Sequence, residues 1–182
     1  MEPDVLVVGA GPVGAAVSIL LARQGYRVLL VECATCPRDK VCAESLSPAC
    51  TPLLAQLGIL DAILTAAPQR LQGMRVIDHW GRSCWRCFIQ DGQCLYGVAL
   101  PGLVLDHLLV EHACREGVEL RTGFWGRQPQ LDGQRVYGVS GQQAQYRETV
   151  CARLVIAADG VQSTLARWLS AWHVRTRIAL CS

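Results

Sequence analysis

Short apolar segments alternate with helical and polar stretches along this chain. Three segments consist almost wholly of Val, Leu, Ile and Ala, which is typical of strands buried on both faces of a parallel sheet; they are residues 5–8, 27–31 and 154–158. We expect a further strand at 118–121. Helical spacing and end signals predict helices at 12–23, 48–57, 105–115 and 161–169. The pattern therefore predicts an α/β fold built on a parallel sheet.

Shorter strands separated by turn residues occupy the remaining chain. We expect them at 74–78, 83–89 and 94–100, with a hairpin of residues 135–140 and 145–150 around Gly141. Residues 34–47 are polar, contain Pro37 and predict a loop. These elements predict a small β layer inserted into the α/β fold.

The first apolar stretch raises the question of a membrane span. Residues 5–22 carry no charge, and this length begins to suggest a transmembrane helix. However, glycines and a proline occupy the first half, and β-branched residues begin it, so strand, turn and helix are favoured. We expect no membrane span, while peripheral membrane contact stays open. Because the amino terminus shows no signal peptide, we expect a cytoplasmic protein.

Composition and charge exclude several classes of protein. The chain has 182 residues, is 51% hydrophobic and carries a net charge of +2, which excludes a disordered chain. A charge this small, without a run of Lys or Arg, also speaks against nucleic-acid binding. The ten cysteines are expected to stay reduced. Two C-x-x-C pairs stand too far apart for a zinc ribbon, so we expect no metal site.

A glycine motif follows the first predicted strand and opens the first predicted helix. It reads Gly9-Ala10-Gly11-Pro12-Val13-Gly14. In a Rossmann-like fold the first glycine permits a tight turn, the second admits a pyrophosphate, and the third lets helix and strand pack closely. Glu32, eighteen residues after Gly14 at the end of the second strand, can accept from ribose hydroxyls and repel a 2′-phosphate. The motif predicts dinucleotide binding but does not separate FAD from NAD.

A second motif follows the last predicted strand. Residues 157–163 read Ala-Ala-Asp-Gly-Val-Gln-Ser, which puts Asp159 at the carboxyl end of a strand, where open α/β sheets bind ligands. The alternative is that Asp159 only caps the following helix. Strands and a helix separate the two motifs, whereas a plain NAD domain would continue in βαβ units.

Together these residues resemble the FAD-dependent monooxygenase and geranylgeranyl-reductase superfamily. Three blocks carry the resemblance: the glycine motif with Glu32, residues 38–48, and residues 157–163 followed by Arg167. The middle block, Arg-Asp-Lys-Val-Cys-Ala-Glu-Ser-Leu-Ser-Pro, is similar to the R-x-K-x-C-G-E stretch of the reductases. It has Ala43 where the family commonly has Gly. Its Glu-Ser-Leu-Ser-Pro part also resembles a loop of flavin-dependent halogenases.

The resemblance implies a role for each matching residue. Gly9, Gly11, Pro12 and Gly14 would hold the FAD pyrophosphate, and Glu32 the adenosine ribose. Arg38 would lie near the adenosine side or the phosphates, and Cys42 and Ala43 beside the flavin. Asp159 and Gly160 would approach the sugar and phosphate region. The resemblance further implies NAD(P)H as reductant and a small-molecule substrate of lipophilic or aromatic type. No catalytic residue is identified.

The family also bears on domain organisation, because its members are longer than this chain. We expect residues 1–182 to form a partial FAD-binding domain, with 68–104 as the start of an inserted substrate-side β region. The expected function is the FAD-binding portion of an NAD(P)H-linked oxidoreductase of hydroxylase or alkene-reductase type, inactive as this piece alone. A non-catalytic remnant or dinucleotide-binding module is the alternative, and a halogenase-like protein is the third choice.

Overall fold

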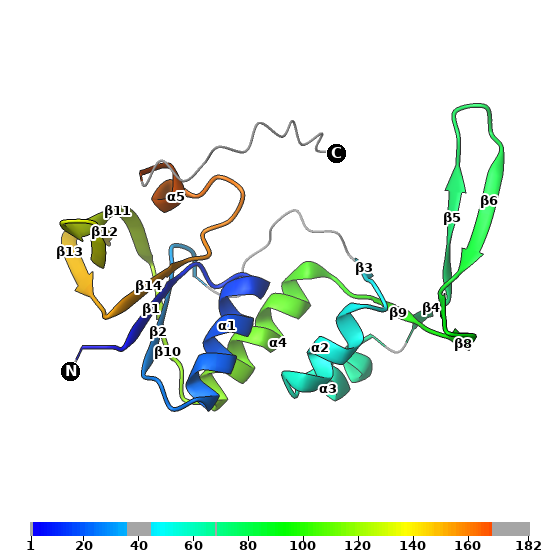
Figure 1. Ribbon diagram of the computed structural model, residues 1–182, viewed down its shortest axis with the longest axis horizontal. Coiled ribbons are helices and arrows are strands. Elements are labelled where there is room, and N and C mark those ends of the chain that lie inside the picture. The colour runs from blue at the N-terminus through cyan, green and yellow to red at the C-terminus, as the bar shows by residue number, and fades with distance from the viewer. Residues whose placement is uncertain (1, 36–44, 68, 169–182) are drawn as a thin grey trace. The chain divides into compact units, whose positions relative to one another are not determined.

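The computed structural model describes residues 2–35, 45–67 and 69–168. The chain divides into two compact units (Figure 1). The first joins Met1–Thr35 to Gly117–Ser182, and the second is Cys36–Glu116. The first unit therefore combines segments from both ends of the chain.

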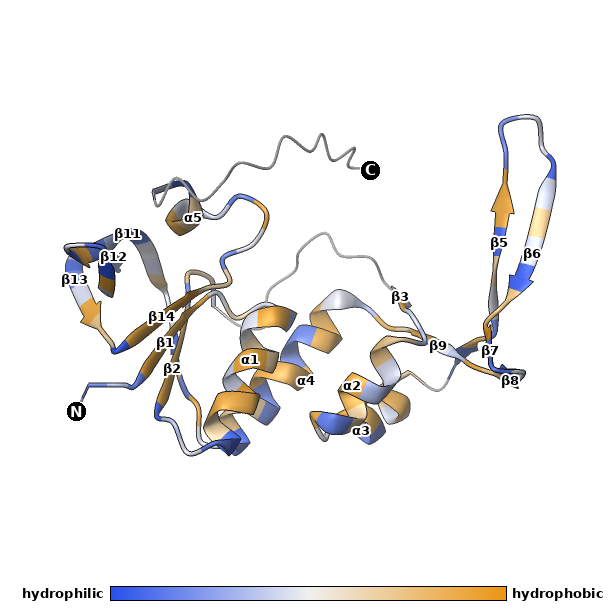
Figure 2. Cartoon of the chain, viewed as in Figure 1, coloured by the Kyte–Doolittle hydropathy of each residue, from blue (hydrophilic) through white to orange (hydrophobic). Residues whose placement is uncertain are grey.

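A four-stranded parallel sheet forms the centre of the first unit. Its order is β10 (Glu119–Thr122), β2 (Val28–Glu32), β1 (Val5–Val8) and β14 (Leu154–Ala157). Val5 is in register with Val28 on one side and with Leu154 on the other. The predicted parallel sheet is thus confirmed, including the pairing of the first and last apolar segments. Figure 2 shows that β1, β2 and β14 are largely hydrophobic.

Both faces of the parallel sheet are covered. Helix α1 (Pro12–Arg23) packs against β1 and β2 and buries Ala15 and Ile19 completely. The opposite face carries Leu6 and Val31, which join one buried cluster with Phe124 of the antiparallel sheet. Since side chains alternate between the faces of a strand, a strand covered on both faces must be apolar throughout.

The antiparallel sheet consists of β11 (Phe124–Asp132), β12 (Arg135–Gln143) and β13 (Tyr146–Cys151). The predicted hairpin of β12 and β13 is present, but its turn lies at Ala144, whose φ is +52°, and not at Gly141. Gly141 lies inside β12, where a Cβ atom would come within 2.6 Å of the Phe124 ring. This glycine therefore serves close packing and does not mark a turn.

The described residues of the second unit, 45–67 and 69–116, form three helices and several short strands. The helices are α2 (Cys50–Gln56), α3 (Leu60–Ala66) and α4 (Gly102–Arg115). Strands β3 (Ser45–Leu46), β9 (Gly97–Ala99) and β4 (Arg70–Leu71) form one antiparallel sheet. Two further pairs are β5 (Gly73–Ile77) with β6 (Ser83–Cys87), and β7 (Ile89–Gln90) with β8 (Gln93–Cys94). Helix α3 was not expected, and β3 lies within the predicted loop.

The last described helix begins later than its sequence pattern suggests. Helix α5 runs over Thr164–Trp168, whereas a helix from 161 was expected. Residues before it form a turn, in which the N–H of Ser163 donates to the carbonyl of Gly160 at 3.0 Å. No helix in the described part of the chain is long and apolar enough to cross a membrane.

Candidate functional site

The carboxyl ends of three neighbouring parallel strands bring the motif residues together. The glycine turn of residues 9–14 follows β1, Glu32 ends β2, and Asp159 follows β14. All belong to the first unit. Because these strands are adjacent and parallel, segments far apart in sequence meet at one edge of the sheet. This is the edge at which open α/β sheets bind ligands.

The glycine turn is packed too closely for side chains at two of its positions. Gly9 has a φ of +105°, and a Cβ atom there would collide with the carbonyl oxygen of Ala158. At Gly14 a Cβ atom would collide with the carbonyl of Gly9 and lie 3.3 Å from the Cβ of Ala158. The two glycines thus allow β14, the turn and helix α1 to approach one another.

The glycine turn leads directly into the amino terminus of α1. Gly11 precedes the helix, and its carbonyl accepts from the N–H of Ala15 at 2.9 Å. Pro12 occupies the first turn, where its missing N–H costs no intrahelical hydrogen bond. The first turn of the helix contains no acidic residue of its own. Such a terminus favours an anion such as a pyrophosphate.

Glu32 is buried, with only 2% of its surface exposed. Its Oε2 accepts from the backbone N–H of Ala10 at 2.8 Å. Its Oε1 accepts from the N–H of Ala34 and from the thiol of Cys33, each at 3.1 Å. A buried carboxylate needs such donors to offset its loss of hydration. Glu32 therefore fixes the glycine turn against the end of β2.

Asp159 is one of two side chains that cap helix α5, the other being Ser163. Its Oδ2 accepts from the N–H of Thr164 at 2.8 Å and from that of Leu165 at 3.4 Å. The structure thus shows the capping role that the sequence had offered as the alternative for Asp159. The second oxygen, Oδ1, is buried and has no hydrogen-bond partner among the described residues. Gly160 follows with a φ of +87° and open space beside its Cα. The cap therefore leaves one carboxylate oxygen able to accept another hydrogen bond.

Other residues of this edge belong to the third block of the resemblance, but the sequence assigned them no role. The carbonyl group and the small side chain of Ala158 pack against the glycine turn. The Oγ of Ser163 accepts from the N–H of Ala166 at 3.0 Å, and Arg167 donates through Nε to the carbonyl of Ser163 at 3.2 Å. The paired alanines at the end of β14 were the available signal for close packing. Arg38, Cys42 and Ala43 lie outside the described residues.

The parallel sheet, the glycine turn and the carboxylate ending β2 define a dinucleotide-binding α/β protein of flavoprotein type. More specifically, the chain belongs to the family described as FAD binding domain, which matches residues 2–178.

Individual relatives agree with this assignment. The chain is 34% identical to a menaquinone reductase of Mycobacterium tuberculosis over 95% of its own length and 41% of that protein's length. It is 30% identical to a rifampicin monooxygenase of Streptomyces venezuelae, covering 91% of this chain and 33% of the relative. The structure of a myxobacterial chondrochloren halogenase superposes with a TM-score of 0.82 at 26% identity, covering 92% of this chain and 40% of that one.

These comparisons establish the Rossmann-type FAD-binding fold and the flavoprotein family. The chain is an FAD-binding domain of the family of flavin-dependent oxidoreductases and monooxygenases, which also has halogenases among its structural neighbours. It spans about two fifths of the length of the menaquinone reductase that it matches.

Proposed function

We propose that this chain is the FAD-binding portion of an NAD(P)H-linked flavin oxidoreductase of hydroxylase or alkene-reductase type. The observation that carries the proposal is the meeting of the glycine turn, Glu32 and Asp159 at one sheet edge. Similarity to a menaquinone reductase and a rifampicin monooxygenase supports an oxidoreductase. The proposed substrate is a small lipophilic or aromatic molecule.

The pyrophosphate of FAD is assigned to the glycine turn. Gly9, Gly11, Pro12 and Gly14 would hold it at the amino terminus of α1. The missing side chains at Gly9 and Gly14 let the turn pack closely on β14, and the helix end favours negative charge. These features fit a diphosphate and require no cationic side chain in the turn.

Glu32 is assigned to the adenosine ribose. Its carboxylate accepts from the N–H groups of Ala10 and Ala34 and from the thiol of Cys33, and ribose hydroxyls are donors of the same kind. The negative charge would repel a 2′-phosphate at the same position. We therefore expect the site to favour FAD over NADP.

Asp159 and Gly160 are assigned to the sugar and phosphate region of the cofactor. The support is the buried Oδ1 of Asp159, which has no partner within the described part of the chain. By resemblance, Arg38 would lie toward the adenosine side or the phosphates, and Cys42 and Ala43 beside the flavin. These three residues complete the proposed cofactor site.

The bound flavin would supply the redox chemistry, with NAD(P)H as the reductant. The described residues bind and orient the nucleotide end, and none is assigned a proton or a substrate. We propose residues 1–182 as a partial FAD-binding domain, with 68–104 as the start of a substrate-side region. Because catalysis requires a positioned substrate in a water-poor site, we expect no turnover by these residues alone.

A halogenase-like protein is the second candidate. It is supported by the chondrochloren halogenase superposition and by 33% identity to a tryptophan 2-halogenase of Chondromyces crocatus over 72% of this chain. A non-catalytic dinucleotide-binding module is the remaining alternative.

Two measurements separate these functions. Retention of flavin absorbance through gel filtration tests cofactor binding. Oxidation of NADH or NADPH, measured with FAD and a full-length relative's carboxyl-terminal portion, tests the redox assignment. We expect flavin retention, and oxidation only with the added portion. Oxidation far above the free-flavin background by the 182-residue chain alone, with a defined substrate, would contradict the assignment of these residues to the nucleotide end. Flavin retention without any oxidation would favour the non-catalytic module.

A further inference from the structure

A cavity lies at the opposite edge of the parallel sheet from the glycine turn. It has a volume of about 340 Å³ and adjoins Val5 and Leu154, the first residues of β1 and β14. The candidate FAD site lies at the other ends of these strands. A strand of four residues is about 13 Å long, so the two sites are separate. The cavity has the size of a small-molecule site.

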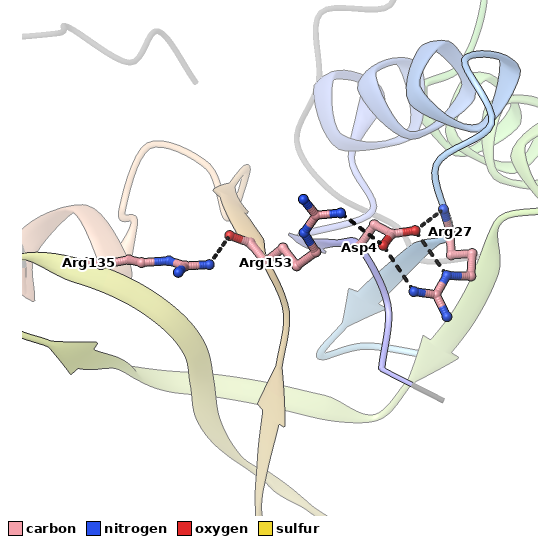
Figure 3. A network of polar contacts seen from close by, with 4 residues as sticks. All are labelled: Asp4, Arg27, Arg135 and Arg153. Carbon is pink, nitrogen blue, oxygen red and sulfur yellow. Dashed lines mark hydrogen bonds and ion pairs between the residues drawn. The ribbon is translucent and has the colours of Figure 1, made fainter.

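Three of the charged residues drawn in Figure 3 line this cavity, namely Asp4, Arg135 and Arg153. Arg27 binds the Asp4 carboxylate through two guanidinium nitrogens, at 2.9 and 3.0 Å, and donates its backbone N–H at 3.1 Å. Nη1 of Arg153 lies 3.8 Å from Oδ1 of Asp4, the oxygen that also accepts from Nη2 of Arg27. Arg135 donates to the carbonyl oxygen of Arg153 at 3.3 Å. The guanidinium groups of Arg27 and Arg153 thus face the Asp4 carboxylate, and Arg135 is held by the backbone of Arg153.

The network contains one carboxylate, that of Asp4, and three arginines, so it carries an excess of positive charge. Asp4 is engaged mainly by Arg27, whose hydrogen bonds lower the pKa of the Asp4 carboxyl to about 2 and keep it ionised. Arg153 has only the longer contact to Asp4, and within the described ranges Arg135 has no carboxylate partner. Arg135 and Arg153 both line the cavity. An anion placed there would therefore pair with Arg135 and with the largely exposed Arg153, whose contact to Asp4 is long.

The remaining wall is apolar and aromatic. Val5 and Leu21 contribute aliphatic surface, while Leu154 and Tyr26 are each 50% exposed. Exposure of these two side chains in a cavity that Arg135 and Arg153 also line suits a ligand with both an apolar and an anionic part. Burial of the apolar part would add about 25 cal/mol for each Å² removed from water.

We propose that this cavity binds an amphipathic anion, a small molecule with a short aliphatic or aromatic body and a carboxylate or phosphate head. The head lies against Arg135 and Arg153, and the body against Leu21, Tyr26 and Leu154. This site is distinct from the proposed FAD site and does not depend on it.

The test uses n-octyl phosphate as the probe, titrated by calorimetry into the full chain saturated with FAD. Saturable binding is expected, with much weaker binding of 1-octanol and of inorganic phosphate. Arg135→Gln and Arg153→Gln should each weaken octyl phosphate binding about fivefold, in line with a partly exposed ion pair. Tyr26→Ser should weaken it as well, through loss of apolar contact. The matched control is Arg147→Gln, an exposed arginine of the same unit outside the cavity.

Three results would overturn the proposal. They are equal affinity of the wild type and both cavity arginine variants, equal binding of 1-octanol, and the disappearance of binding when FAD is present. Circular dichroism of each variant excludes unfolding as the cause of weaker binding. A chain that fails to bind FAD but binds octyl phosphate with this arginine dependence would refute the proposed function and support this second site.

Discussion

The backbone N–H of Ala10 donates to the Glu32 carboxylate at 2.8 Å, across twenty-two positions of the chain. This bond joins the turn after β1 to the end of β2 and positions the carboxylate beside the proposed pyrophosphate turn. One buried acid thus shapes the glycine turn and stands where the ribose is proposed to bind. Stability and cofactor affinity are expected to depend on the same side chain.

Glu32→Ala should weaken FAD binding by about 1–3 kcal/mol, since charge-assisted hydrogen bonds are lost and buried donors remain. The measurement is isothermal titration with FAD, accompanied by thermal unfolding. Glu119→Ala, at an exposed position at the start of β10, is the matched control and should bind normally. Unchanged FAD affinity in the Glu32 variant, or a wild-type preference for NADP, would refute the ribose assignment.

Gly14→Ala should lower the free energy of unfolding by about 1–3 kcal/mol, because the added methyl group collides with the carbonyl of Gly9. Displacement of the turn should also reduce FAD affinity. Gly133→Asn is the control, because Gly133 has a φ of +60° and open surroundings that Asn tolerates. Chemical denaturation measures both variants, and equal stability would show that the turn is not tightly packed.

Asp159 allows its capping role to be separated from its proposed cofactor role. Asp159→Asn keeps an oxygen for Thr164 and Leu165 but removes the charge, whereas Asp159→Ala removes the acceptor of these two N–H groups and leaves Ser163 as the remaining cap. We expect a loss of about 0.5–2 kcal/mol of stability for Ala and a smaller loss for Asn. FAD affinity should fall in both variants. Normal FAD affinity in the Asn variant would leave Asp159 as a helix cap alone.

Acid stability should depend on Asp4. Its hydrogen bonds with Arg27 lower its pKa from 3.8 to about 2 in the folded chain. The pair therefore stabilises the fold above pH 3.8, and this contribution is lost as the pH falls toward 2. Urea midpoints measured between pH 5 and pH 2 should converge for the wild type and Asp4→Asn as the pH falls. Parallel curves would show that the ion pair adds no stability, and added salt should reduce the difference.

The parallel sheet could be predicted because uninterrupted Val, Leu and Ile segments are specific for strands covered on both faces. Strand β11 was missed, since Gly126 and Pro129 interrupt its pattern. Gly141 was misread as a turn because the sequence does not show that Phe124 packs against it. Helix α3 is short and gains its support from contacts with α2 and α4. These features depend on tertiary packing and not on local preference.

Part of the candidate site could also be predicted from the sequence. The glycine spacing and Glu32 carry information in themselves, since few other structures require that combination. Asp159 was ambiguous because a helix cap and a ligand position place the same residue at the same point. The structure shows that one oxygen makes the cap, which neither motif nor spacing could reveal.

The central claim is that residues 1–182 hold FAD at the edge formed by the glycine turn and Glu32. The most direct measurement is a titration of FAD followed by flavin fluorescence, with the wild type, Glu32→Ala and the Glu119→Ala control. The account predicts saturable binding near one FAD per chain, weakened in the Glu32 variant alone. A chain folded by circular dichroism that binds no FAD, or that binds it equally in all three forms, would contradict the account.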